Sequence, residues 1–127
     1  DMGTATTINV ISKSGVYEGG LFLPGVDVAL ESMSYRAALL PDISLRPPKG
    51  LIGKDSEECM LSGIVYGNAA MLDGLIERIR EMFQGDEVSV VATGRNAPLI
   101  VRYCRHLSAH DPNLLMEGLW HIYQRNR

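Results

Sequence analysis

Residues 4–23 constrain the fold most, because they combine two strand-like segments with a turn. Residues 4–12 alternate in polarity and are rich in β-branched side chains, which is typical of a strand. Lys13-Ser14-Gly15 is a turn whose glycine can take a positive φ, and residues 16–23 return as a second strand. Gly19-Gly20 predicts a bulge or a close backbone approach in that strand. The sequence therefore predicts an antiparallel hairpin at the start of the domain.

A helix and a long loop are predicted next. Apolar residues at helical spacing follow Pro24-Gly25 and predict a helix over residues 26–39, which Pro41 stops. Residues 42–53 then read as a loop that contains adjacent prolines. A connection of this length in a small domain is often functional or lies against a partner.

The longest predicted helix runs to Gln84 and ends at Gly85. Asp55 is its expected N-cap, and Glu58, three residues on, completes a loose capping box. Two faces of the first half are apolar, with Met60, Ile64 and Met71 on one and Leu61, Val65 and Leu72 on the other. Such a helix needs two surfaces to bury against. Gly63, Gly67 and Gly74 lie within it, and they are compatible with tight packing inside the domain or with a subunit interface.

The last third of the chain predicts two further strand-like segments, each followed by a helix. Residues 88–93 form a nearly continuous apolar run, as expected of a strand buried on both faces. Asn96 and Pro98 mark the start of a helix, residues 106–111 suggest a short edge strand or loop, and Pro112 starts the final helix. The predicted fold class is α/β, with a mixed sheet that begins with the antiparallel hairpin and is flanked by helices.

Composition narrows the class of protein. The chain has 127 residues, 46% of them hydrophobic and 21% charged, which fits one globular domain. Its formal net charge of −3 gives no basic footprint for nucleic acid, and no apolar run approaches the roughly 20 residues of a membrane span. No signal peptide is expected before Asp1, and the two cysteines are expected to be reduced thiols of a cytoplasmic protein, although the sequence leaves a disulfide open.

Three further side chains have chemistry that could serve a catalytic or metal site. Cys59 is expected to be a small core residue rather than a nucleophile, because no histidine near it in sequence could activate it. His106 and His110 are four residues apart and would need a further ligand to hold a metal ion.

The first four residues, Asp1-Met2-Gly3-Thr4, carry the candidate site. Gly3 has no Cβ to hold an anion away, so backbone amides and the Thr4 hydroxyl can approach a phosphate, while Asp1 can hold a cation beside it. Taken alone the pattern is a weak signal that favours an ordinary turn, because Asp, Gly and Thr are common turn residues. Thr93-Gly94 before a helix start is a second place where α/β folds bind nucleotide or phosphate.

A set of motifs gives the chain a family resemblance. They are Asp1 to Thr7, Gly19-Gly20, Pro24-Gly25, Ile52 to Ser56, Ser62 to Gly67, Asp73-Gly74, Ala92-Thr93-Gly94, Gly118-Leu119 and Ile122 to Asn126. In this order and at these separations the chain resembles the second half of a type III pantothenate kinase. The resemblance covers essentially the whole chain.

That resemblance implies a fold and an activity. Residues 1–127 would form the second (C-terminal) ribonuclease-H-like domain of an actin-like, two-domain kinase whose first domain is absent from this chain. The family phosphorylates pantothenate with ATP, the first step of coenzyme A biosynthesis. It uses Mg²⁺ and a monovalent cation, K⁺ or NH₄⁺, and works as a cytoplasmic homodimer. The general base and the first phosphate-binding turn belong to the preceding half, so no catalytic residue is expected in this chain and the fragment alone is expected to be inactive.

The resemblance also assigns site residues. Asp1 would ligate the monovalent cation, Gly3 and Thr4 would contact ATP phosphates, and Ser56 would contact pantothenate across the dimer interface. Two positions depart from the family pattern: Arg95 stands where a glycine is usual, and Asp55 replaces an asparagine and adds a carboxylate near a carboxylate-bearing substrate.

Two other functions remain open at this stage. One is a kinase homologue without catalysis that binds nucleotide as an accessory factor, which the Arg95 departure would suit. The other is a dimerisation module built on the glycine-containing helix, which predicts dimers without nucleotide binding.

Overall fold

The hairpin predicted at the start of the domain is present in the computed structural model, which describes residues 1–84 and 86–127. Strand β1 (Ala5–Ile11) pairs antiparallel with β2 (Tyr17–Pro24). Val10 faces Gly19 and Ile11 faces Tyr17, so Glu18 is the extra residue of a bulge. A Cβ at Gly20 would overlap the carbonyl oxygen of Ile8, which confirms the close backbone approach.

Helix α1 (Val26–Arg36) follows β2 and ends earlier than predicted, because Ala37 is already extended. The segment between Ala37 and Asp55 contains no helix or strand, as expected. It is fastened to the next helix: the Arg46 guanidinium and the Lys49 backbone N–H both donate to the Glu58 carboxylate at 2.8 Å. The long loop therefore lies against the rest of this chain.

Helix α2 (Ser56–Met82) begins as predicted, since the Asp55 carboxylate accepts a 2.8 Å hydrogen bond from the Glu58 N–H. The second hydrogen bond of the predicted capping box does not form. The buried Glu58 carboxylate accepts hydrogen bonds from Arg46 and the Lys49 N–H instead of reaching back to Asp55. The helix ends at Met82, short of the predicted Gln84, and Gly85 lies outside the described residues.

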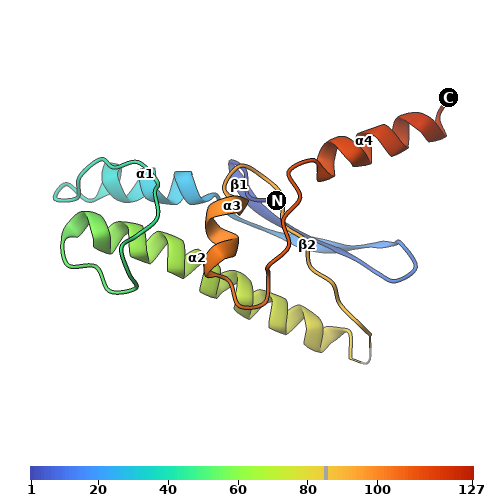
Figure 1. Ribbon diagram of the computed structural model, residues 1–127, viewed down its shortest axis with the longest axis horizontal. Helices are drawn as coiled ribbons and strands as arrows, with labels where there is room; N and C mark the ends of the chain where they lie inside the picture. The colour runs from blue at the N-terminus through green and yellow to red at the C-terminus, as the bar shows by residue number, and fades with distance from the viewer. Residues whose placement is uncertain (85) are drawn as a thin grey trace.

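The core forms around α2, which is buried on two sides as its sequence predicts. Its buried apolar residues are Met60, Leu61, Ile64, Val65, Ala69, Leu72 and Ile76. Helix α1 runs beside α2 and adds Val26 and Leu30 to this cluster (Figure 1). A Cβ at Gly63, Gly67 or Gly74 would meet no atom within 4 Å, so tight packing inside the domain is the wrong explanation for these glycines.

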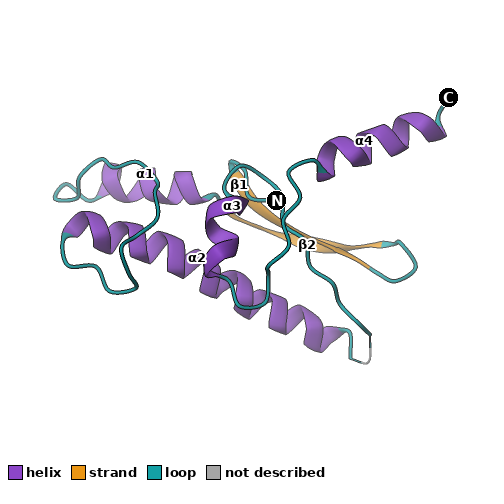
Figure 2. Cartoon of the chain, viewed as in Figure 1, coloured by secondary structure: helices purple, strands orange, loops and turns teal. Residues whose placement is uncertain are grey.

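The predicted strand over residues 88–93 is absent. Only Ala92 pairs, through a parallel bridge to His110, with Ala92 N donating to Ala109 O at 3.0 Å and Asp111 N donating to Ala92 O at 2.8 Å. Within the described residues the sheet therefore has two antiparallel strands flanked by helices, and the predicted mixed sheet is wrong (Figure 2). Apolar composition alone does not provide the hydrogen-bonded neighbour that a strand needs.

Two short helical segments follow. Helix α3 (Ala97–Ile100) begins after Asn96 as predicted, and a 3₁₀ turn, η1 (Val101–Tyr103), continues it. The buried Asp73 carboxylate of α2 fixes the next residues, because it accepts hydrogen bonds of 2.8–2.9 Å from the backbone N–H groups of Arg105 and His106.

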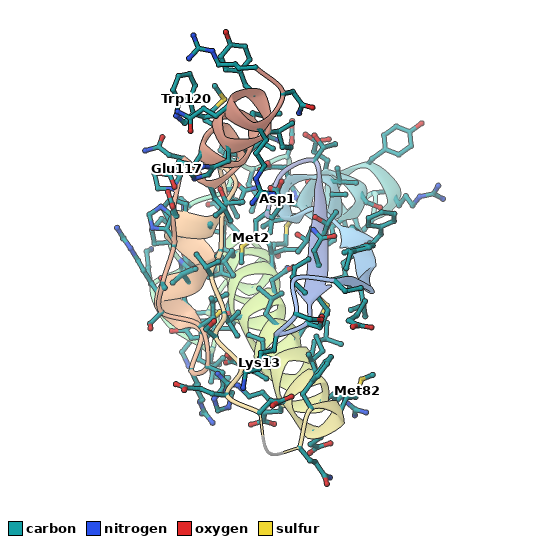
Figure 3. The ribbon with its side chains drawn as sticks, turned by 90° about the vertical axis from the view of Figure 1, so that its right-hand side faces the viewer. Asp1, Met2, Lys13, Met82, Glu117 and Trp120 are labelled. Carbon is teal, nitrogen blue, oxygen red and sulfur yellow. The ribbon has the colours of Figure 1, made fainter. Side chains whose placement is uncertain are left out.

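The final helix, α4 (Leu114–Arg125), extends away from the body of the molecule (Figure 1). It starts two residues after Pro112, and none of its residues is buried. Figure 3 shows Glu117 and Trp120 of α4 at one extremity of the molecule and Met82 of α2 at the other.

One described helix, α2, is long and apolar enough to cross a membrane by length and composition. Half of its most apolar stretch is buried inside the fold, and the core helix of a soluble protein meets the same criterion.

Candidate functional site

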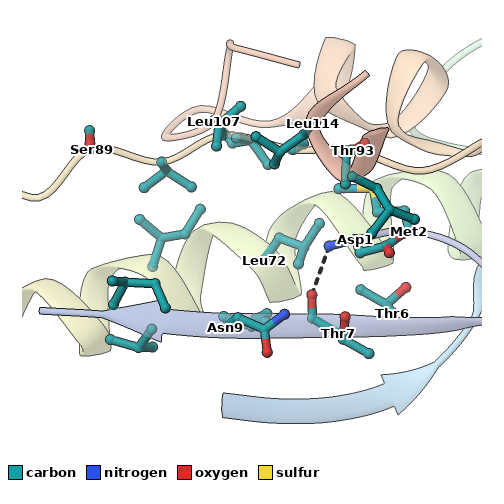
Figure 4. A pocket seen from close by; sticks show the side chains of 18 of the residues that line it. Asp1, Met2, Thr6, Thr7, Asn9, Leu72, Ser89, Thr93, Leu107 and Leu114 are labelled. Carbon is teal, nitrogen blue, oxygen red and sulfur yellow. Dashed lines mark hydrogen bonds between the residues drawn. The ribbon is translucent and has the colours of Figure 1, made fainter. Parts of the chain in front are cut away.

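The first seven residues fold back on themselves. The Asp1 nitrogen donates to the Thr7 carbonyl at 2.8 Å (Figure 4). The Thr7 N–H donates to the Asp1 carbonyl at the same distance. Met2 bridges to Thr6, and Gly3 N donates to Ala5 O at 3.1 Å. This turn places Asp1, Gly3 and Thr4 together at the head of β1.

The second candidate turn, residues 93–96, lies directly against the first. Met2 N donates to Thr93 O at 2.8 Å, and Asn96 N donates to Met2 O at 3.2 Å. Gly94 has a φ of +96°, and a Cβ there would lie 2.5 Å from Met2 N and 2.6 Å from the Asp1 carboxylate. The structure thus joins two motifs that the sequence suggested separately.

The start of α1 closes a third side. A Cβ at Gly25 would lie 2.8 Å from the Gly3 carbonyl oxygen and would overlap that of Thr4. Asp27, in the first turn of α1, accepts from the Arg95 guanidinium at 2.8 Å and from the Asn96 side chain at 3.0 Å. The unusual Arg95 is therefore tied to α1 by an ion pair.

Thr4 offers the free donors of this site. Neither its hydroxyl nor its backbone N–H takes part in a hydrogen bond among the described residues, and its side chain is exposed. The Gly3 N–H, in contrast, already donates to Ala5. A Cβ at Gly3 would meet only ordinary contacts of 3.7 Å or more, so packing within the described chain does not require glycine there.

Asp1 is the negative charge of the turn. Its carboxylate forms no ion pair with any described residue and lies next to Gly94. No cluster of three or more histidine, cysteine or acidic side chains suited to a metal occurs in the described residues. A cation at Asp1 would therefore need carbonyl or hydroxyl oxygens, or a ligand, to complete its coordination.

Ser56 does not join this group. It is the exposed first residue of α2, and Figure 1 shows that end of α2 far from the chain's N-terminus. Within one chain the structure brings Asp1, Gly3 and Thr4 together and leaves Ser56 apart.

The histidine and cysteine candidates form no further catalytic or metal site among the described residues. His106 Nε2 lies 2.7 Å from the Glu77 carboxylate. Cys104 and Cys59 are both free thiols; burial, with a smaller contribution from the Asp73 carboxylate, raises the pKa of Cys104 to about 11. Cys59 is exposed, so its expected place in the core is wrong.

Sequence reasoning missed Asp27 and the side-chain role of Asn96. Asp27 was visible only as an acidic residue in a first helical turn, and Asn96 as an N-cap, yet Asn96 bonds to Asp27 rather than to its own helix. Thr6 was also missed: its hydroxyl oxygen is buried and has no hydrogen-bond partner among the described residues.

The family model for type III pantothenate kinase matches residues 1–78. Curated proteins named type III pantothenate kinase include one from Nocardia farcinica, 42% identical over 99% of this chain and 49% of the relative. Another, from Rhodococcus jostii, is 38% identical over all of this chain and 48% of the relative. A third, from Thermobifida fusca, is 41% identical over 99% of this chain and 50% of the relative.

A solved structure shares the fold. It comes from Campylobacter jejuni and is described as a Baf family transcriptional activator. The match covers 98% of this chain and 55% of the solved chain, with a TM-score of 0.59 and 19% sequence identity. At this identity the likeness shows a shared fold and nothing further.

Residues 1–78, which include the turn at Asp1–Thr4, thus match a family of kinases, enzymes that transfer phosphoryl groups. The chain belongs to the type III pantothenate kinase family. It spans about half the length of the curated relatives that it matches.

Proposed function

We propose that the intact protein containing this chain phosphorylates pantothenate with ATP, the first step of coenzyme A synthesis. Family membership supports the reaction. The observation that carries the proposal in this chain is the juxtaposition of Asp1, Gly3 and Thr4 with the turn at Gly94, because it gathers a carboxylate, unpaired donors and open backbone in one place.

Thr4 is the proposed phosphate-binding residue. Its hydroxyl and amide are available, and hydrogen bonds from such donors strengthen when they meet a charged oxygen. Gly3 contributes by having no Cβ, which lets a phosphate approach the backbone beside Thr4. Phosphoryl transfer depends chiefly on positioning and on neutralising charge, so groups of this kind suit it.

Asp1 is the proposed ligand for the monovalent cation, K⁺ or NH₄⁺. Its carboxylate is unpaired among the described residues, and a single carboxylate beside carbonyl oxygens suits a weakly charged ion. Mg²⁺ bound with ATP would supply further charge neutralisation at the transferred phosphoryl group. The Arg95 guanidinium is paired with Asp27 in the first turn of α1, so its charge is partly neutralised beside the site.

The chain would be the second ribonuclease-H-like domain of an actin-like kinase, and the general base would come from the other half. We also propose a cytoplasmic homodimer in which Ser56 meets pantothenate bound by the partner. Two observations support an interface along α2: the open space beside Gly63 and Gly67, and a hollow lined by Leu51, Ile52, Tyr66 and these glycines.

The test is a pantothenate phosphorylation assay on the full-length gene product, with and without K⁺. We expect turnover that requires ATP, Mg²⁺ and K⁺ or NH₄⁺, and no turnover from residues 1–127 alone. Nucleotide binding by the full-length protein without phosphorylation under any of these conditions would instead support an accessory role. Turnover by the 127-residue chain would contradict the assignment of the general base to the other half.

A further inference from the structure

Three segments that are far apart in the sequence, residues 1–4, 25–27 and 93–96, contact one another pairwise at the candidate site. The first segment is bonded to the third through the backbone N–H and carbonyl groups of Met2. The second lies against the first so closely that Gly25 leaves no room for a Cβ between them. The remaining contact, between the second and third segments, completes the arrangement.

That remaining contact is made by side chains. The Asp27 Oδ2 atom accepts a hydrogen bond from Asn96 Nδ2 at 3.0 Å, and Arg95 Nη2 lies 2.8 Å from the same oxygen. No backbone hydrogen bond joins residues 25–27 to residues 93–96 in the part of the chain that the structure describes. The Asp27 carboxylate therefore provides the polar link between the start of α1 and this turn.

Asn96 is the better fixed of the two donors. Its residue is only 8% exposed, whereas the Arg95 side chain is 65% exposed and its ion pair is screened by water. The Asn96 backbone is also held on both sides, because its N–H donates to Met2 and its carbonyl oxygen accepts from the Ile100 N–H, each at 3.2 Å. Asn96 thus joins α1, α3 and the turn at Asp1–Thr4.

Thr4 depends on this arrangement for its position. Its hydroxyl and backbone N–H form no hydrogen bonds among the described residues, so its neighbours determine where these donors point. Met2, two residues earlier, is bonded to Asn96, and the Thr4 carbonyl group lies against Gly25. A hydrogen bond to a phosphate oxygen tolerates displacements of only a few tenths of an ångström. Separation of α1 from the 93–96 turn would therefore misplace the Thr4 donors.

We propose that Asp27 and Asn96 are positioning residues for phosphate binding. Their hydrogen bond holds the start of α1 against the 93–96 turn and thereby keeps the Thr4 donors in place. Neither side chain touches ATP in this role, and the exposed Arg95 contributes little to it. This inference rests on the proposed function, in which Thr4 binds a phosphate group of ATP.

The first experiment is a double-mutant cycle on the full-length protein, with kcat/KM for ATP measured at saturating pantothenate. Asn96→Ala should lower this value about 5- to 20-fold, mainly through the KM for ATP, and leave the KM for pantothenate unchanged. In the Thr4→Ala background the same substitution should change it by less than about twofold, because the group that it positions is already gone. A loss of folded protein would instead lower kcat equally in both backgrounds.

Three further variants separate the hydrogen bond from the ion pair. Asp27→Ala removes the acceptor from the other side and should reproduce the effect of Asn96→Ala, which also provides the test if Asn96→Ala does not fold. The conservative Asp27→Asn keeps an oxygen for Asn96 and should restore kcat/KM to within about twofold of the wild type. Arg95→Ala, the matched control on the same carboxylate oxygen, should also stay within about twofold.

Amide hydrogen exchange tests the inference without turnover. In Asn96→Ala, residues 2–7 should exchange at least about fivefold faster than in the wild type, because the hydrogen bonds that close the turn open more often. Helix α2 should exchange at the wild-type rate in the same sample. Arg95→Ala should leave both segments unchanged.

Four results would overturn the inference. Unchanged exchange of residues 2–7 would show that Asn96 does not hold the turn, and equal losses with Thr4 and with Ala at position 4 would show that Asn96 does not act through Thr4. A loss in Arg95→Ala as large as in Asn96→Ala would assign the effect to the ion pair, and activity of Asp27→Asn no higher than that of Asp27→Ala would assign it to the charge. Absence of turnover by the wild type would contradict the proposed function instead, and exchange would still decide whether Asn96 holds the turn.

Discussion

Gly94 lies so close to Met2 that a Cβ at Gly94 would be 2.5 Å from the Met2 nitrogen. The positive φ of 96° makes any other residue unfavourable there as well. This contact holds residues 93–96 against the turn that carries Asp1 and Thr4.

Substituting Gly94→Ala in the intact protein should lower the free energy of unfolding by about 1–3 kcal/mol, because both the clash and the φ are unfavourable. The matched control is Gly74→Ala, where a Cβ meets open space within a helix and should stabilise by up to about 1 kcal/mol. Urea unfolding midpoints measure both. Equal midpoint shifts for the two variants would show that the Gly94 contact is not tight.

Replacing Thr4 with alanine should reduce kcat/KM for ATP about 10- to 100-fold, which corresponds to one hydrogen bond to a charged group. Thr4→Ser keeps the hydroxyl and should retain most activity. Thr4 is exposed, so both variants should unfold at the same urea concentration as the wild type. If Thr4→Ala were as active as Thr4→Ser, the hydroxyl would not contact the phosphate.

The ion pair between Arg95 and Asp27 should have a small energetic effect, because the Arg95 side chain is 65% exposed. A double-mutant cycle with Arg95→Ala and Asp27→Asn should give a coupling energy of about 0.2–1 kcal/mol. We expect Arg95→Ala to leave the KM for ATP nearly unchanged. A large rise in that KM would mean that Arg95 leaves Asp27 and binds the nucleotide.

Glu58 should make stability depend on pH in the acid range. Hydrogen bonds from Lys49 N–H and Arg46 hold the pKa of Glu58 below its usual 4.5. A lowered pKa in the folded state stabilises the protein above pH 4.5, and this contribution disappears as the pH falls through the folded pKa.

Glu58→Gln should therefore unfold at a lower urea concentration than the wild type at pH 7, and the two should converge at low pH. Glu31→Gln, an exposed substitution on α1, is the control and should match the wild type throughout. A difference between Glu58→Gln and the wild type that stays constant with pH would assign the effect to packing rather than to charge.

The two cysteines should differ sharply in reactivity. At pH 8, a Cys104 pKa of about 11 leaves this thiol roughly 100-fold less ionised than its ordinary value of 9.0 would. Cys59 is exposed, so iodoacetamide should modify it well before Cys104. Mass spectrometry of time points distinguishes the two sites. Because the folded state retains the Cys104 proton, stability should also fall as the pH rises from about 9 towards 11. Comparable rates at the two sites would contradict the burial of Cys104.

Local patterns were sufficient to predict the hairpin and the start of the longest helix. The alternation on either side of Gly15 predicted β1 and β2, and Asp55 predicted where α2 starts, because these signals depend on neighbours in sequence. Residues 88–93 were predicted wrongly because a strand also requires a pairing edge, which sequence composition does not reveal.

The candidate site was predicted in its parts but not in its assembly. Asp1 to Thr4 and Thr93-Gly94 were recognised separately, whereas their contact depends on the complete fold. The pairing of Asn96 with Asp27 joins residues 69 apart and left no local signal. The roles of Asp1, Gly3, Thr4 and Ser56 in binding remain predictions from family resemblance.

The hydrogen bond from Met2 to Thr93 also has a consequence for folding during synthesis. Residues 1–4 leave the ribosome before residues 93 and 94, so the contact between the two turns cannot form until residue 93 and the glycine after it have been translated. Contacts across such a separation are slow to form, because the intervening loop must be closed first. A nascent chain that ends before residue 93 would therefore carry the turn at Asp1–Thr4 without the neighbouring turn that holds Met2 in place.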